Sequence, residues 1–335
     1  MSEKIKILML GDSRSGKTCF MLGMYAAIQN GSKFSLKATD PDEGVEMATL
    51  WSTIVGESGE ERWPRGTDTP QIYNFELCYA YKSLIEFEWL DYRGGSMLDI
   101  SSDDNVRTLR NYAAESNGLF FCISGKDLRE PVTEANLQNI AIKSKANLMG
   151  QYLQYLNINR RPARKKSFPI IIMVTKYDYC YHRNKRELIE DIKKIFSPLF
   201  ASGSGWLVTI CPVTLGKELA QDRDNGKIEP KNFDLPLPFV SYCILTEQAR
   251  SQYEKRKEIE YQLDVLKSSN PLIKLIQWQD RVKKIRDINQ RLEQANMQLK
   301  ETKDMIKILA KELDLSITDI YLSGKKIKID LKEKN

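Results

Sequence analysis

The sequence of 335 residues predicts an α/β protein in which a mostly parallel sheet carries helices on both faces and is followed by a C-terminal helical arm. Two observations predict this fold class. Up to about residue 245, short apolar runs alternate with longer segments of helical periodicity, as expected for crossover connections between parallel strands. After residue 246, these strand patterns give way to long, highly charged helical segments.

Apolar runs rich in β-branched and aromatic residues are the expected strands: 5–10, 34–38, 72–80, 83–91, 118–124, 169–175 and 206–213. Only the runs 72–80 and 83–91 lie close enough in sequence to form an antiparallel hairpin. The helical patterns cover residues 17–29, 42–55, 104–116, 134–157 and 185–200, and one more begins near 236.

The segment 246–315 has the pattern of a helical hairpin or coiled-coil arm. Its first helix is interrupted by "SSNP" at 268–271, and its second helix keeps a heptad seam. One seam position holds Ile285, Leu292, Leu299, Ile306 and Leu313, and the other holds Ile288, Ala295, Thr302 and Leu309. We expect this seam to bind a protein partner or a second copy of the chain, or else to pack on its own domain or on the preceding helix.

These patterns divide the chain into an α/β domain at 1–245, the arm at 246–315 and a short terminal hairpin or tail at 316–335. The net charge of +6 is too small to indicate a specific nucleic-acid partner. No apolar run approaches the roughly 20 residues that span a membrane, and the apolar start is too short for a signal peptide. With its six cysteines lacking C-x-x-C spacing, the chain is expected to be a cytoplasmic protein with reduced thiols.

Residues 11–18, "GDSRSGKT", match the phosphate-loop pattern G-x-x-x-x-G-K-[ST], between an expected strand and an expected helix. Backbone N–H groups in such a loop surround phosphates. Lys17 would neutralise the β- and γ-phosphate oxygens, and the hydroxyl of Thr18 would bind Mg²⁺. The nucleotide-binding residues expected here are Gly11, Asp12, Ser13, Arg14, Ser15, Gly16, Lys17, Thr18 and the following Cys19.

The residues expected to bind the base of the nucleotide lie much later in the chain. "TKYD", residues 175–178, ends an expected strand, at the sheet edge where α/β proteins bind ligands. The Asp178 carboxylate would accept from both N1–H and the exocyclic amino group of guanine, two donors that adenine lacks. Lys176 would lie along the base, and Thr175 stands where Asn is commoner. Thr214 and Leu215, in "CPVTLG", are candidates for a backbone N–H that meets guanine O6.

The metal end of the site is expected at "LDYRGG", where Asp91 and Gly94 fit the pattern D-x-x-G. Asp91 would hold Mg²⁺ through water, and the Gly94 N–H would contact the γ-phosphate. Thr67, in "WPRGT", is the preferred switch threonine and a further Mg²⁺ ligand because it follows a flexible Arg-Gly pair; Thr69 is the alternative.

The order of these elements resembles the Ras-like translation-factor class of P-loop GTPases over about residues 4–245. More narrowly, "WPRGT" and "LDYRGG" are similar to motifs of the bacterial double-GTPase group. The resemblance implies a P-loop GTPase fold, GTP or GDP as the ligand, Mg²⁺ as the cofactor and hydrolysis of GTP.

The sequence departs from this class at Gly95, where Ras-like GTPases carry the Gln that orients water. Hydrolysis is therefore expected to be slow or to recruit another group. Arg14 occupies the position at which guanylate-binding proteins, which this loop resembles, carry an internal arginine finger. We take Arg14, Lys17 and Thr67 as catalytic, with Arg65 and Arg93 as rival arginines. An Arg14 that points to solvent or pairs with an acid is the alternative.

Together these features predict a GTPase switch whose arm couples the nucleotide state to assembly. Two other interpretations stay open. A GTP-loaded scaffold with little hydrolysis is favoured by Gly95, and an ATP-dependent P-loop enzyme is disfavoured by Asp178.

Overall fold

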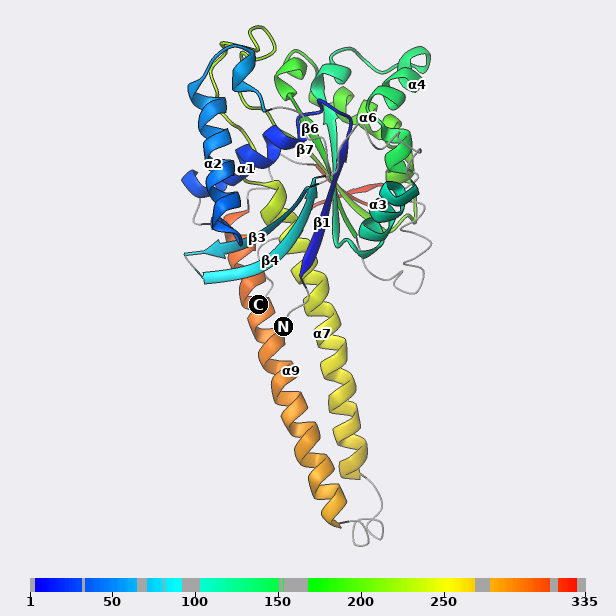
Figure 1. The fold of residues 1–335 in the computed structure, drawn as a ribbon. Helices are drawn as coiled ribbons and strands as arrows, with labels where there is room; N and C mark the ends of the chain where they lie inside the picture. Colours follow the sequence, from blue (N-terminus) through cyan, green and yellow to red (C-terminus); the bar gives the residue numbers. More distant parts are fainter. Residues whose placement is uncertain are drawn as a thin grey trace. The chain divides into compact units, whose positions relative to one another are not determined.

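The computed structural model describes residues 4–31, 34–64, 71–80, 82–91, 103–150, 153, 168–268, 278–313 and 319–329 (Figure 1). The chain forms two compact units. The first comprises Met1–Val240 and Leu313–Glu333, and the second comprises Ser241–Glu312 and Lys334–Asn335.

Within the described residues of the first unit, nine strands form one sheet in the order β2-β3-β4-β1-β5-β6-β7-β8-β9. Their bounds are β1 Ile5–Gly11, β2 Phe34–Ala38, β3 Gln71–Tyr79, β4 Lys82–Asp91, β5 Gly118–Ser124, β6 Phe168–Thr175, β7 Trp206–Pro212, β8 Asp319–Leu322 and β9 Lys325–Ile327. The seven strands predicted before residue 245 are confirmed to within one residue at each end.

The sheet is parallel in its centre and antiparallel at its edges. Strands β4, β1, β5, β6 and β7 run parallel to one another. The predicted hairpin between β3 and β4 is confirmed. The predicted strand β2 pairs antiparallel with β3, a pairing that the sequence did not indicate. At the other edge, β8 pairs antiparallel with β7 and β9 with β8, so the expected terminal hairpin extends the sheet. The carboxyl ends of the five central strands therefore lie along one edge.

With two exceptions, the helices of the described residues follow the predicted pattern. The bounds of all these helices are α1 Lys17–Gly31, α2 Pro41–Gly56, α3 Asp103–Glu115, α4 Glu134–Lys143, α6 Lys185–Ile195, α7 Pro236–Ser268 and α9 Trp278–Glu312. Short 3₁₀ turns are η1 Glu60–Arg62, η2 Gly125–Leu128, η4 Tyr177–Cys180 and η5 Ser197–Phe200.

One of these predicted helices is interrupted, and the other ends earlier than predicted. The predicted helix 134–157 is interrupted after Lys143, because Lys145 adopts a left-handed conformation with φ of 59°; residues 146–150 are helical again. The predicted helix 185–200 ends at Ile195 and continues as the turn η5, because Pro198 lacks the N–H that would extend the α-helical ladder.

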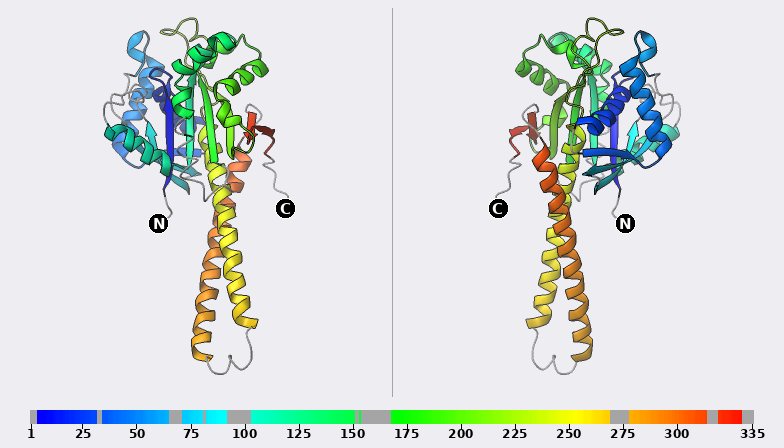
Figure 2. Two further views of the ribbon diagram at one scale, coloured as in Figure 1. Left: turned by 90° about the vertical axis from the view of Figure 1, so that its right-hand side faces the viewer. Right: turned by 90° about the vertical axis from the view of Figure 1, so that its left-hand side faces the viewer.

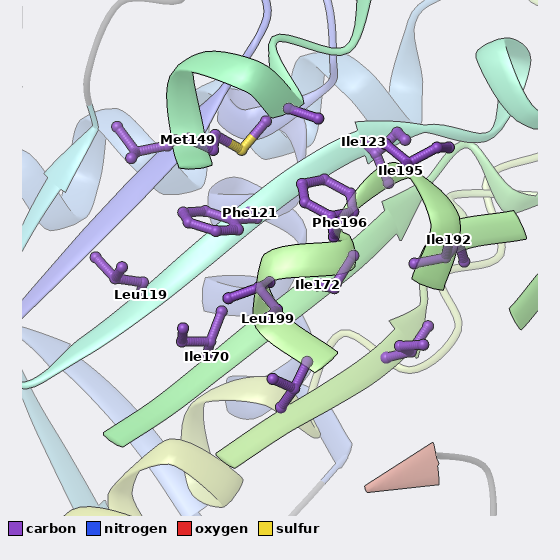
Figure 3. Close-up of a cluster of buried hydrophobic side chains, with 14 of the residues drawn as sticks. Leu119, Phe121, Ile123, Met149, Ile170, Ile172, Ile192, Ile195, Phe196 and Leu199 are labelled. Carbon is purple, nitrogen blue, oxygen red and sulfur yellow. The ribbon is translucent and has the colours of Figure 1, made fainter. Parts of the chain in front are cut away.

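Helices cover both faces of the sheet because each buried strand sends alternate side chains to opposite sides. On one face, Phe121 of β5 and Ile172 of β6 are fully buried in a cluster with residues of α3, α4 and α6 (Figure 3). On the other face, Phe20 of α1 packs on Trp89 and Phe120, with ring centres 6.4 and 6.3 Å apart. Since both faces are covered, the carboxyl edge is the open place for a ligand.

The second unit contains most of α7 and all of α9, which lie side by side and antiparallel in every view (Figures 1 and 2). The seam predicted in α9 coincides with its least exposed positions. Ile288, Leu299, Thr302 and Leu309 are buried, whereas Met297, outside the seam, is 58% exposed. Whether this hairpin acts as a coiled coil toward a partner stays a prediction. No helix in the described part of the chain combines the length and apolar character needed to cross a membrane.

Candidate nucleotide-binding site

The loop of residues 11–18 joins β1 to α1 at the carboxyl edge of the sheet, and a cavity of about 580 Å³ lies beside it. The cavity wall comes from this loop, the first turn of α1, the two residues after η1, the end of β6 with its following turn, and the long connection between β7 and α7. Its residues are Ser13, Arg14, Gly16, Lys17, Thr18, Cys19, Phe20, Trp63, Pro64, Thr175, Lys176, Asp178, Tyr179, Val213, Thr214, Leu215, Leu219, Arg223 and Phe233. Three stretches that the sequence analysis assigned to phosphate and base binding thus share one cavity.

The phosphate loop turns through two left-handed residues, Arg14 with φ of 67° and Gly16 with φ of 88°. The first bond inside α1 runs from the N–H of Phe20 to the carbonyl of Gly16, at 2.8 Å. The N–H groups of the preceding first turn therefore have no carbonyl to bond within their own helix. This conformation, at the N-terminus of a helix, is suited to binding an anion.

Lys17 is buried, and its ammonium Nζ donates to the carbonyls of Gly11 at 3.1 Å and Asp12 at 3.0 Å. An ammonium group has three N–H donors, so one remains after these two bonds. Lys17 is thereby held under the loop in a position to share its charge with a bound phosphate.

The turn after β6 supports the phosphate loop directly. The Thr175 hydroxyl lies within hydrogen-bond distance of two carbonyl oxygens, those of Ser15 and of Ile123, the latter at 3.2 Å. Lys176 is left-handed, with φ of 50°, and its Nζ donates to the carbonyl of Arg14 at 2.8 Å. A Cβ added to Gly125 would lie 2.4 Å from the Lys176 carbonyl, so only glycine allows this turn to approach the end of β5. Hydrogen bonds therefore link the segment expected to bind the base to the loop expected to bind phosphate.

Asp178 is buried in the part of the cavity wall where the sequence predicts the nucleotide base to bind, which we call the base end. Its Oδ1 accepts a hydrogen bond from the Thr214 hydroxyl at 2.9 Å, and that hydroxyl also accepts from the N–H of Gly216. Its Oδ2 is buried without a hydrogen-bond partner among the described residues. Burial raises the pKa of the Asp178 carboxyl, and the bond from Thr214 opposes part of that rise. The site therefore contains one acceptor whose hydrogen-bonding capacity is unused.

Cys19 also lines the cavity, and burial raises the pKa of its thiol to about 11, which disfavours the thiolate form. All six cysteines are free, and the five others are buried.

Several lining residues were not predicted from the sequence, among them Trp63 and Arg223, and neither was the buried Arg62 that precedes Trp63. Trp63 and Arg223 line the cavity, and the Arg223 guanidinium lies 5.4 Å from the centre of the Trp63 ring. Arg62 is buried and donates to the carbonyls of Ile54 at 3.2 Å, Asp224 at 3.0 Å and Gly226 at 2.9 Å. The motif "WPRGT" was a signal for Trp63, whereas Arg223 lies in the polar loop "QDRDNG", which carries no recognisable pattern.

Other predicted residues cannot be placed in the cavity. Thr67, Thr69, Arg65, Arg93, Gly94 and Gly95 lie outside the described residues. The backbone of Asp91 ends β4 and pairs with Met9 of β1, but its side chain is outside the described part. Arg14 is exposed and makes no ion pair with any acid that the structure describes.

No family model matches the chain, and no curated protein matches it. Among solved structures, the signal recognition particle receptor SRb-GTP/SRX complex from Chaetomium thermophilum matches 57% of this chain and 78% of its own, with a TM-score of 0.35 and 10% identity. A similarity this low assigns neither a family nor a function. The resemblance to the double-GTPase group therefore stays a prediction.

Proposed function

We propose that this chain is a GTP-binding protein with a P-loop GTPase fold that hydrolyses GTP to GDP and phosphate. One observation carries the proposal: in the cavity beside the phosphate loop, the buried Oδ2 of Asp178 has no hydrogen-bond partner within the described part of the chain, while the Thr214 hydroxyl donates to its Oδ1. Guanine has two adjacent donors, N1–H and the exocyclic amino group, where adenine has an acceptor. A guanine base would complete the hydrogen bonds of Asp178, whereas adenine would leave a buried carboxylate oxygen unpaired.

The expected metal ligands are hard oxygen donors, which suit Mg²⁺. They are the hydroxyls of Thr18 and Thr67 and the carboxylate of Asp91. The pairing of Asp91 with Met9 brings the end of β4 next to the strand that leads into the phosphate loop. When bound, the metal neutralises charge on the β- and γ-phosphate oxygens.

In the proposed reaction, water forms a bond to the γ-phosphorus, the bond to the β–γ bridging oxygen breaks, and GDP leaves with the electron pair. Lys17 has one N–H to offer to the phosphates and stabilises the charge that develops there. Arg14 lines the same cavity without an ion pair to a described acid, so its guanidinium is available for that charge too. The Gly94 N–H is the proposed contact to the γ-phosphate.

Competition between GTP and ATP for the protein in the presence of Mg²⁺ tests the nucleotide. We expect GTP to bind and a large excess of ATP to leave it bound, and we expect Lys17→Ala to abolish binding. Preferential binding of ATP would replace the proposal with an ATP-dependent P-loop enzyme.

Phosphate release under single-turnover conditions tests hydrolysis. Release that rises with protein concentration, together with a larger particle by light scattering in GTP than in GDP, would indicate a GTPase activated by self-association through 246–315. Tight GTP binding without release at any concentration would instead support the GTP-loaded scaffold that Gly95 favours.

A further inference from the structure

Three cationic side chains line both the cavity described above and a second cavity of about 710 Å³ at the phosphate loop: Arg14, Lys176 and Arg223. Among the residues that the structure describes, none of the three forms an ion pair. The pKa of Lys176 is lowered first by burial and then by the positive charge of Arg223. Cations that line the same cavity repel one another, and an anion bound among them would offset the repulsion.

Arg223 is the one of these cations that belongs to neither nucleotide motif. It comes from the connection between β7 and α7, which also supplies Thr214 and Leu215 at the base end. Its guanidinium is placed by the Trp63 ring, 5.4 Å away. An aromatic face orients a guanidinium without using its N–H donors, so those of Arg223 stay available for a ligand.

The Trp63 ring is itself fixed by polar contacts. Its indole N–H donates to Oδ1 of Asp224 at 3.2 Å. The neighbouring Arg62 donates to the carbonyls of Asp224 and Gly226, at 3.0 and 2.9 Å. These bonds join the turn η1 to the loop that carries Arg223, so the tryptophan and the arginine are held together.

We propose that Arg223 binds the phosphate nearest the ribose of the nucleotide, with Trp63 as its positioning residue. This inference rests on the proposed function. Arg223 lines both cavities. The first contains Asp178 together with Gly16, Lys17 and Thr18 of the phosphate loop, and the second contains the loop residues Asp12 to Ser15 without Asp178. The part of a nucleotide between base and terminal phosphates is common to GDP and GTP. Arg223 therefore contributes equally to the binding of both.

Isothermal titration of the full chain with GDP and with a non-hydrolysable GTP analogue, both with Mg²⁺, tests this contact. We expect Arg223→Gln to weaken both ligands by about tenfold, as for the loss of one hydrogen bond to a charged group. Arg186→Gln is the matched control, because Arg186 is exposed on α6 and lines neither cavity. A loss confined to the GTP analogue, or no loss at all, would overturn the proposal.

The role of Trp63 has its own test. Trp63→Leu removes the ring and should weaken both ligands, whereas Trp63→Phe keeps a ring and should weaken them less. The double variant with Arg223→Gln should be no weaker than Arg223→Gln alone, because the two residues act as one unit. If the losses of affinity in the two single variants add up in the double variant, Trp63 does not act through Arg223 and has only a structural role. A wild-type chain that binds neither ligand would remove the proposed function, whereas wild-type binding with an unaffected Arg223→Gln removes only this inference.

Discussion

The base end and the phosphate end of the site are built differently. At the base end, Thr175, Asp178 and Thr214 are all buried and joined to neighbouring segments by hydrogen bonds, which leave one carboxylate oxygen for a ligand. At the phosphate end, Arg14 is exposed, left-handed and without an ion pair to any described acid. A preformed, buried hydrogen-bond network favours selective binding of one base. An exposed cation, by contrast, can be positioned against the phosphates after the nucleotide has bound. We therefore expect nucleotide selection and turnover to be separable by mutation.

The largest expected effect comes from the base end. Asp178→Asn replaces an acceptor by a donor that faces the guanine N1–H, so GTP should bind about 100-fold more weakly. Xanthine nucleotide, which carries a carbonyl in place of the amino group, should then compete with GTP. Competition titrations measure both changes, and an unchanged preference for GTP would contradict the assignment of Asp178.

Arg14→Ala tests the phosphate end. Loss of the guanidinium should lower GTP turnover at least tenfold, at the weak end of what arginine fingers contribute, while leaving GTP affinity nearly unchanged. Single-turnover phosphate release and titration give the two values. Equal turnover in wild type and variant would remove Arg14 from the mechanism.

Arg14→Gly also removes the guanidinium, and it tests whether the Arg14 side chain contributes to stability. Glycine adopts a φ of 67° without the steric cost that arginine has there, although it also gains more freedom in the unfolded chain. The melting temperature should therefore change little, and turnover should fall as in Arg14→Ala. A parallel fall in melting temperature would indicate that the Arg14 side chain stabilises the fold.

Thr175→Val tests whether the base end supports the loop. Without the hydroxyl, the carbonyls of Ser15 and Ile123 lose a donor, which should cost about 1 kcal/mol of stability. GTP and GDP affinities should fall together by about fivefold, whereas Thr175→Ser, which keeps the hydroxyl, should bind normally. Chemical unfolding and titration check both, and a selective loss of GTP would contradict the bracing role.

The smallest expected effect is a gradual dependence of GTP affinity and of stability on pH. Burial raises the pKa of Asp178 above the ordinary 3.8, so the carboxylate is protonated at a higher pH than an exposed one. Protonation removes an acceptor for guanine, and GTP affinity should fall as the pH drops through this raised value. In the nucleotide-free protein the sign is reversed, because a raised native pKa favours the protonated form and stability declines as the pH rises through it. The Asp178→Asn variant should lack both dependences.

The positions of the strands and of the phosphate loop follow from local sequence patterns. Runs of β-branched and aromatic residues predicted the seven strands before residue 245, and the segment 11–18 was placed between a strand and a helix because each has its own periodicity. The "TKYD" segment was located by the same reasoning. The helix predicted at 134–157 failed because a left-handed Lys145 depends on surroundings that no periodicity shows.

Tertiary structure alone decided which distant segments meet. The bond from Lys176 to the Arg14 carbonyl joins residues 162 apart, and the bond from Trp63 to Asp224 joins residues 161 apart. The pairing of β8 with β7, and the contact of Arg223 with Trp63, likewise have no counterpart in the local pattern. Such contacts depend on the order in which strands assemble and on the loops that this order brings together, and a single sequence carries no local signal for either.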